Sequence, residues 1–194
     1  LAFKEIPKGI DPLGPKNKVY ILTGPVTGTA FPESGRYHVV SKSPQSGILG
    51  DSNSGGKFGP WLRFSGYDGI VVEGEASTPQ YLSIVEGKPK LNRAEHLWGK
   101  GVIHTDKKIR EEMKSPTEGS ILAIGPAGEK LANVSAIMND IGRAAGRTGL
   151  AAVLGSKKLK AIFVKGKSRP EIVNEKAFLK IVKEKQKKAK KHPV

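Results

Sequence analysis

The chain of 194 residues is 37% hydrophobic and 26% charged, which is ordinary for one sizeable globular domain or two small ones. It has no cysteine and no apolar run near the roughly 20 residues of a membrane span, so a disulfide framework, a cysteine nucleophile and a transmembrane helix are excluded within it. We expect a cytoplasmic protein without a membrane partner, and the net charge of +15 directs attention to anionic ligands.

Strands and glycine-rich turns are predicted in the first part of the chain. After an irregular, proline-rich lead-in, VYILTGP indicates a buried strand that ends at Gly24-Pro25. Runs of β-branched residues predict further strands at 37–43 and 67–74. Between them, GDSNSGGKFGP at 50–60 is too small and polar for core, and predicts a loop that leads into a helix at about Phe58.

The middle of the chain alternates hairpin, helix and strand patterns. Residues 80–94 predict a hairpin that turns at Gly87-Lys88-Pro89, and residues 104–114 predict a helix with Thr105 as its N-cap. Further strands are predicted at 120–126, 133–138 and 159–166.

The end of the chain predicts a lysine-rich helix. Asn174 is a good N-cap, and Phe178, Ile181 and Val182 form an apolar stripe that fades before His192-Pro193-Val194. We interpret residues 169–194 as the basic helical start of a following domain that is cut short. A frayed tail explains the same pattern about as well.

The lysines of this helix also bear on the choice of partner. Residues 175–194 hold eight lysines and two glutamates, which give +6 of the net +15. Aromatic residues do not interleave with the basic clusters, so stacking platforms for single-stranded nucleic acid are not visible. A solvated lysine face is therefore favoured over a nucleic-acid partner.

Two segments of the chain are similar to each other. SNSGGKFGPWLRFSGYDGIVVEG (52–74) and AAGRTGLAAVLGSKKLKAIFVKG (144–166) align without a gap, and each passes from a small-residue loop through a short apolar helix to a strand that ends in glycine. A strand broken by Gly-Pro precedes both segments. We therefore predict an α+β fold in which duplicated β-α-β repeats, over about 19–74 and 120–166, form two packed sheets, mixed or antiparallel.

The first loop has the composition of a site for a phosphate and its metal. Backbone N–H groups at a helix start favour an anion, and Gly55 and Gly56 let a ligand approach the backbone. Asn53 offers a carbonyl oxygen to a hard cation such as magnesium, and Ser52 and Ser54 add hydroxyls. A tight solvent-facing turn explains the composition about equally well.

The second loop contributes cations. Arg143 and Arg147 lie four residues apart in a run almost free of bulky side chains, and Arg36 begins a predicted strand. Arginine forks grip phosphate or the edge of a flat ring, although a single arginine is most often a surface residue. The pairing of the two loops favours one bulky phosphorylated cofactor. Carboxylates near glycines, such as Asp51 and Asp140, have no second catalytic residue at a spacing that would indicate a catalytic pair. The residues alone therefore predict no reaction.

Five stretches of the chain resemble a known family. They are TGPVTGTAFPESGRYHVVSKSPQSG, GDSNSGGKFGPWLRFSGYDGIVVEG, HLWGKG, IGPAGE and IMNDIGRAAGRTGLAAVLGSKKLKAI. They are similar to the N-terminal domain of the aldehyde ferredoxin oxidoreductase family, and the resemblance runs from about residue 8 to residue 168. GDSNSGG and GRAAGRTG, with GSKKLKAI following, are together very specific.

The resemblance implies a tungsten enzyme, less often a molybdenum one, that oxidises aldehydes to carboxylic acids and passes electrons through an iron–sulfur cluster to ferredoxin. In that family two pterin dithiolenes, a bis-molybdopterin, hold the metal, and Mg²⁺ bridges their phosphates. Residues 1–168 would then be the tungstopterin-binding N-terminal domain, a duplicated base on which the bis-pterin lies.

The resemblance also implies roles for individual residues. Asn53 and the backbone carbonyl of Ala144 correspond to the magnesium bridge, and Arg36 corresponds to an arginine between pterin and cluster. The predicted pterin-contacting positions are Gly55, Arg143, Gly146 and Arg147, to which the composition of the first loop adds Ser54 and Gly56.

The chain lacks other parts of that family's enzyme. The cysteines of the 4Fe–4S cluster, the other pterin motifs and the substrate pocket belong to later domains, so we expect this chain alone to be inactive. The remaining domains, or a second subunit, would complete an enzyme that we expect to be a homo-oligomer. Two alternatives stay open, a basic nucleic-acid-binding module and a cofactor-free structural subunit.

Overall fold

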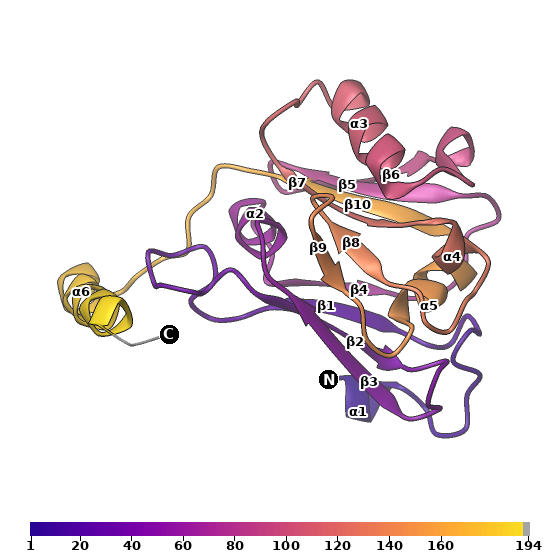
Figure 1. The fold of residues 1–194 in the computed structure, drawn as a ribbon, viewed down its shortest axis with the longest axis horizontal. Helices are drawn as coiled ribbons and strands as arrows, with labels where there is room; N and C mark the ends of the chain where they lie inside the picture. The colour runs from indigo at the N-terminus through magenta and orange to yellow at the C-terminus, as the bar shows by residue number, and fades with distance from the viewer. Residues whose placement is uncertain (192–194) are drawn as a thin grey trace.

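The computed structural model describes residues 1–191, and its body consists of two β-sheets that face each other (Figure 1). The first sheet contains β1 (Val19–Thr23), β2 (Tyr37–Lys42), β3 (Leu49–Ser54) and β4 (Gly69–Val72). Its strands are antiparallel in the order β3-β2-β1-β4, and the helix α2 (Phe58–Phe64) joins β3 to β4.

The second sheet is larger. It contains β5 (Gln80–Val85), β6 (Lys88–Arg93), β7 (Ser120–Ile124), β8 (Ile137–Asn139), β9 (Arg143–Ala145) and β10 (Leu159–Lys165), with the helix α5 (Leu150–Ser156) between the last two. The spatial order is β6-β5-β10-β7-β8-β9. Strand β10 pairs in parallel with β5 and antiparallel with β7, so the sheet is mixed.

The strand order confirms the predicted duplication. In the first half the chain makes β1, β2, β3, α2 and β4, and in the second half it makes β7, β8, β9, α5 and β10, with the same antiparallel neighbours in both. Helices α2 and α5 begin and end at equivalent positions of the two aligned segments. The hairpin β5–β6 extends the second sheet beyond the shared pattern.

The core lies between the two sheets, where both helices of the repeat contribute to it (Figure 1); α5 is almost fully buried, and α2 buries Phe58, Gly59 and Leu62. Inward-facing residues of the strands, such as Ile21, Val39 and Ile162, pack around Leu62 of α2 and Val153 of α5. The outer face of the second sheet is covered by the short helix η1 (Glu95–Leu97) and by α3 (Val102–Glu112), which bury Leu97 and Ile109 against it. The second sheet is therefore covered on both faces.

Several local predictions were wrong. Helix α3 begins at Val102 with Gly101 as its N-cap, and the hydroxyl of Thr105 donates back to the carbonyl of Gly101. The hairpin turns at Glu86-Gly87, because both residues adopt the left-handed conformation of a two-residue turn and Lys88 already belongs to β6. Only the end of the strand predicted at 133–138 is formed, whereas the proline-rich lead-in is irregular as predicted and is preceded by the short helix α1 (Ala2–Glu5).

The most instructive error concerns GDSNSGG, which is mostly strand. Residues Leu49–Ser54 form all of β3 and pair with β2 along its full length. The side chains alternate, with Ser52 and Ser54 buried and Asp51 and Asn53 exposed. Small polar residues are used here because this edge strand packs against the second half of the chain.

The remaining elements are the short helix α4 (Pro126–Glu129) and the C-terminal helix α6 (Glu175–Lys191). Helix α6 lies apart from the two sheets (Figure 1), and Asn174 caps it through a bond from Ala177 N to Asn174 Oδ1. Val182 is buried and the ring of Phe178 lies near that of Phe31, while the lysines are exposed. The predicted stop at His192-Pro193-Val194 lies outside the described residues. Across residues 1–191, no helix has both the length and the apolar character needed to cross a membrane.

Candidate functional site

The two predicted loops meet where the edge strands of the two sheets, β3 and β9, pack against each other. The backbone N–H of Arg147 donates to Ser52 Oγ at 3.1 Å. The hydroxyl of Ser43 donates to the carbonyl of Thr148 at 2.8 Å. A Cβ on Gly50 would lie 2.7 Å from Thr148 Oγ1, so this close approach requires glycine. The two halves of the duplication are therefore joined at the loops themselves.

A hollow of about 390 Å³ opens at this junction. Its lining comes from both halves and consists of Asp51, Ser52, Asn53, Ala144, Gly146 and Arg147. Four of these residues are predicted site residues. Asn53 precedes the other three, Ala144, Gly146 and Arg147, by about 90 positions in the sequence, and the fold brings them together.

The cations predicted for the site lie near this hollow. Arg36 donates from Nη1 to Asn53 Oδ1 at 2.6 Å, so the guanidinium is held over the outward face of β3. Arg147 lines the hollow directly. Arg143 is exposed at the start of β9, and its Cγ lies 3.3 Å from the position that a Cβ on Gly56 would take. The arginines of the second half therefore lie beside the glycines of the first.

Two site residues were missed by sequence reasoning. Asp51 lines the hollow, and its Oδ1 lies 3.0 Å from Nδ1 of His38. Asp51 and His38 lie on the same outward face as Asn53, because side chains two residues apart in a strand point the same way. A strand assignment for residues 49–54 would have grouped them, whereas a loop assignment could not.

The glycines of the two loops differ in what they require. A Cβ on Gly55 would have no atom within 4 Å, and one on Gly146 would meet only Ala136 Cβ at 3.8 Å. Neither residue has a positive φ, so the protein itself does not require glycine at these positions. Gly56 has a φ of +97°, and a Cβ there would lie 2.6 Å from Asn139 Oδ1, so the fold does require this glycine.

The structure separates Ser54 from the rest of the predicted site. Its side chain is buried on the inward face of β3, and its hydroxyl donates to the carbonyl of Gly55 at 3.4 Å. The Ser54 hydroxyl thus does not share the hollow, and a role in ligand binding would have to use the backbone. The predicted contribution of this hydroxyl to a phosphate site does not fit its position.

The donor set favours an anionic group with a hard cation. Backbone carbonyls, the Asn53 amide and the Asp51 carboxylate offer oxygen ligands, and Arg147 offers a phosphate-binding fork. No group of three His, Cys, Asp or Glu side chains that would suffice for a metal ion occurs within residues 1–191. A cation in the hollow would therefore need oxygens from its own ligand as well as from the chain.

Comparisons with known proteins agree with one another. Residues 1–166 match the family described as aldehyde ferredoxin oxidoreductase, N-terminal domain. The chain is 50% identical over 194 residues to a tungsten-containing aldehyde ferredoxin oxidoreductase of Thermococcus kodakarensis, which covers all of this chain and 32% of that protein. A protein of the same description from Pyrococcus furiosus is 48% identical over the same share of each chain. The chain thus spans about a third of the length of these relatives.

More distant relatives share the domain and have other substrates in their names. A protein of Pyrococcus furiosus described as an aliphatic sulfonate oxidoreductase, WOR-like subunit, is 37% identical over 89% of this chain and 29% of its own length. A solved structure, the active-site complex BamBC of benzoyl coenzyme A reductase with 1,5 dienoyl-CoA, is 31% identical with a TM-score of 0.91. The likeness covers 94% of this chain and 28% of that one.

Proposed function

The chain belongs to the aldehyde ferredoxin oxidoreductase family through that family's N-terminal domain, and from this premise we propose that it forms the base that holds a tungsten or molybdenum bis-molybdopterin. The observation that carries the proposal is the meeting of the two loops in one hollow, with lining residues from each half of the duplication. Named relatives that contain tungsten support the choice of metal.

The residues present fit such a group. No protein atom fills the space beside Gly55, and only Ala136 approaches that beside Gly146. The backbone conformation at both positions would also allow a larger residue. A flat ligand that lies directly on the backbone explains why both positions are glycine. Arg147, Arg143 and Arg36 provide positive charge for phosphates, and arginine binds phosphate through paired N–H donors.

We assign the bridging Mg²⁺ to the oxygens of Asn53 and Ala144. Both residues line the hollow, one offering its side-chain amide and the other its backbone carbonyl. Magnesium takes oxygen ligands, and it is commonly bound by a few protein oxygens together with phosphate oxygens of its ligand. Arg36 holds the Asn53 amide through a 2.6 Å bond and so orients it. In this role the chain binds, orients and neutralises the cofactor.

The complete enzyme is proposed to oxidise aldehydes to carboxylic acids, with ferredoxin as electron acceptor. When bound, the tungsten pterin supplies the two-electron oxidation. This chain has no cysteine, so the ligands of a 4Fe–4S cluster must come from outside residues 1–194. We therefore propose that the other parts of the enzyme supply the cluster and the substrate pocket, and that this domain alone does not turn over aldehydes. The assembled enzyme is proposed to be a cytoplasmic homo-oligomer.

The test measures metal and pterin in protein purified anaerobically from cells supplied with tungstate. Wild type should contain tungsten or molybdenum with pterin and magnesium. The variants Asn53→Ala and Arg147→Ala should each lose most of the tungsten and magnesium, because each removes a group that lines the hollow. Arg93→Ala is the matched control, since this exposed arginine lies on β6, the edge strand far from the hollow, and pairs with Glu95 of η1.

Two results would overturn the proposal. Wild-type protein with neither metal nor pterin would exclude a cofactor base. Full loading of Asn53→Ala and Arg147→Ala would instead indicate a cofactor-free structural subunit, which is the alternative from a different class.

A further inference from the structure

A strained turn precedes the cofactor-facing residues of the second half. Strands β8 and β9 are joined by Asp140-Ile141-Gly142, in which Asp140 has a φ of +44° and Ile141 a φ of +66°. Left-handed backbone is unfavourable for residues with a side chain, above all for a β-branched one such as isoleucine. Such a turn persists only where its surroundings hold it. Arg143 and Ala144 follow this turn directly.

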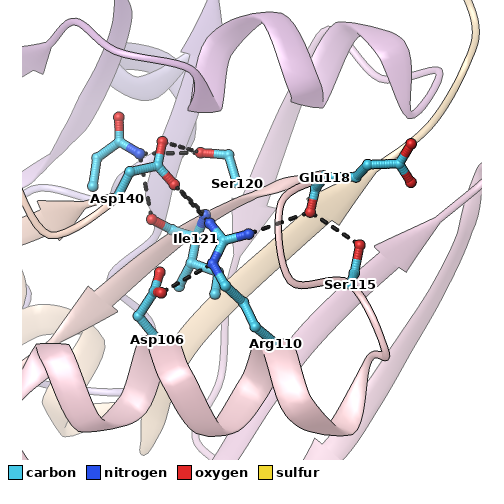
Figure 2. A network of polar contacts seen from close by, with 8 residues as sticks. Asp106, Arg110, Ser115, Glu118, Ser120, Ile121 and Asp140 are labelled. Carbon is cyan, nitrogen blue, oxygen red and sulfur yellow. Dashed lines mark hydrogen bonds and ion pairs between the residues drawn. The ribbon is translucent and has the colours of Figure 1, made fainter.

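The Asp140 side chain holds this turn in place through its hydrogen bonds (Figure 2). Its Oδ2 accepts a bond from the Ser120 hydroxyl at 2.7 Å, and its Oδ1 accepts from the backbone N–H of Ile121 at 3.1 Å. The guanidinium of Arg110 on α3 also approaches Oδ1, with Nη2 at 3.5 Å. One carboxylate thus ties the turn to the first residues of β7 and to the helix that covers the sheet.

Arg110 is itself held in place by its neighbours. Its Nε donates to Asp106 Oδ2 at 2.9 Å, and its Nη1 donates to the carbonyl of Glu118 at 3.3 Å. Figure 2 shows Asp106 and Arg110 projecting together from α3 toward Asp140. Bonds to ionised groups are stronger than those between neutral groups, so this arrangement resists displacement of the carboxylate.

Asn139 strengthens the same connection from inside the sheet. It is fully buried, and its Nδ2 donates to Ser120 Oγ at 3.1 Å and to the carbonyl of Ile121 at 3.3 Å. Its Oδ1 lies where a Cβ on Gly56 would be 2.6 Å away, so the amide also abuts the first loop. Across the hairpin, Asn139 is the register partner of Arg143. We call the bonded side chains of Asp140, Asn139, Ser120 and Arg110 the clamp. The clamp therefore reaches both loops of the hollow.

The hairpin is short, and besides these side chains it is held by the pairing of β8 with β7, by the bond from the Asp140 N–H to the Ile121 carbonyl at 3.1 Å and by the packing of β9 against β3. Strands β8 and β9 are three residues long each, and β9 is the edge of its sheet. Resting on the function proposed above, we propose that Asp140 is a positioning residue for the cofactor site. Through Ser120, Ile121 and Arg110 it holds the β8–β9 turn, and so fixes Arg143 and the Ala144 carbonyl relative to Asn53.

The test compares substitutions at two carboxylates, Asp140 and Glu112, each of which connects α3 to the second sheet. In the holoenzyme, Asp140→Ala removes the clamp and Asp140→Asn keeps one carbonyl acceptor. Glu112→Gln is the matched control, because Glu112 also links α3 to the sheet, through Tyr81 OH of β5 at 2.7 Å. Its other partner is His96 Nε2 of η1 at 2.6 Å, away from the β8–β9 turn. Tungsten and pterin per chain should fall at least fivefold in Asp140→Ala, less in Asp140→Asn, and stay at the wild-type level in Glu112→Gln.

A rescue variant separates positioning from general stability. Glycine adopts a positive φ without strain, so adding Ile141→Gly to Asp140→Ala should restore part of the tungsten content. The tungsten(V) electron paramagnetic resonance spectrum of the loaded fraction should change in Asp140→Ala and stay unchanged in Glu112→Gln. Equal cofactor loss in Asp140→Ala and Glu112→Gln would overturn the proposal, and so would full loading of Asp140→Ala.

Amide hydrogen exchange keeps this test independent of the proposed function. Residues 141–146 should exchange at least tenfold faster in Asp140→Ala, and in Asp140→Asn if the alanine variant does not fold, than in wild type or Glu112→Gln. Unchanged exchange there would overturn the clamp even in a protein that contains cofactor. A wild-type protein without tungsten or pterin would refute the proposed function, while faster exchange in the variant would still support the clamp.

Discussion

The two halves of the molecule share one topology but hold their parts of the site in different ways. In the first half, Asn53 lies on β3, a strand of six residues that pairs with β2 along its full length. In the second half, Arg143 and Ala144 lie on a strand of three residues that follows a left-handed turn. Backbone pairing fixes β3 and the bond from Arg36 orients Asn53, whereas in our proposal the side-chain bonds of Asn139 and Asp140 orient the second set. The same strand order can therefore be stabilised in two ways, by the backbone pairing of a long strand or by bonds from polar side chains.

The ion pairs of the two halves differ in the same direction. Lys160 on β10 and Asp68, before β4, occupy equivalent positions of the aligned segments. Lys160 pairs with Glu129, and these side chains are 0% and 4% exposed, whereas Asp68, which pairs with Arg63, is 83% exposed. Burial lowers the pKa of Lys160, and the Glu129 carboxylate counters part of that shift. The second half thus depends more heavily on buried polar groups than the first.

The largest expected effect comes from breaking this buried pair. Glu129→Ala leaves the Lys160 ammonium buried against two neutral acceptors, the carbonyls of Lys100 and Ile124. Removing one partner of a buried ion pair lowers the free energy of unfolding by about 3–5 kcal/mol. Asp68→Ala removes the exposed counterpart and should lower it by less than about 1 kcal/mol. Urea unfolding of the two variants measures the contrast, and equal losses would contradict the difference between the halves.

The sequence was sufficient for the elements that hydrophobic patterns determine. The β-branched runs of β1, β2, β4, β7 and β10 face the core and were predicted, as was the duplication of the loop, helix and strand. Strand β3 was not predicted, because its small polar residues reflect packing against the second half and the side-chain alternation of an edge strand. Local propensity does not contain that information.

The site was predictable only in part for a similar reason. Asn53 and Arg147 were predicted from composition and from the family resemblance, and Ala144 and Gly146 from the resemblance alone; the fold brings all four to one hollow. Asp140 was visible only as an isolated carboxylate, because its partners lie 19 to 30 positions away in the sequence. Contacts over such distances are set by the sheet order and have no local signal.

Alanine substitutions of the adjacent Gly55 and Gly56 should separate effects on folding from effects on ligand binding. The expected change in the free energy of unfolding is smaller than for Glu129→Ala. Gly56→Ala places a Cβ 2.6 Å from Asn139 Oδ1 at a φ of +97°, so the free energy of unfolding should fall by about 1–3 kcal/mol. Gly55→Ala meets no neighbour and should change it by less than about 0.5 kcal/mol. Gly55→Ala should nevertheless reduce tungsten content, because its Cβ enters the space assigned to the cofactor. Normal tungsten content in a stable Gly55→Ala protein would argue against a ligand at that backbone.

The smallest expected effect concerns the bonds that join the halves. Ser52→Ala removes the acceptor of the Arg147 N–H, and both residues line the hollow. Ser43→Ala removes the donor to the Thr148 carbonyl, and also an acceptor for the N–H groups of Gln45 and Ser46. Each change should lower the free energy of unfolding by about 1 kcal/mol, with Ser43→Ala the larger because more bonds are lost.

The two serine variants should differ in the opposite order when cofactor is measured. Ser52 contacts the backbone of Arg147, which lines the hollow, whereas Ser43 acts on Thr148 from the other end of the β2–β3 hairpin. Ser52→Ala should therefore lower tungsten content more than Ser43→Ala, although it destabilises the fold less. Thermal unfolding and metal analysis on the same preparations test this reversal. If tungsten content simply follows stability across the pair, the junction between the halves acts as scaffold alone, and the orientation of Arg147 does not depend on Ser52.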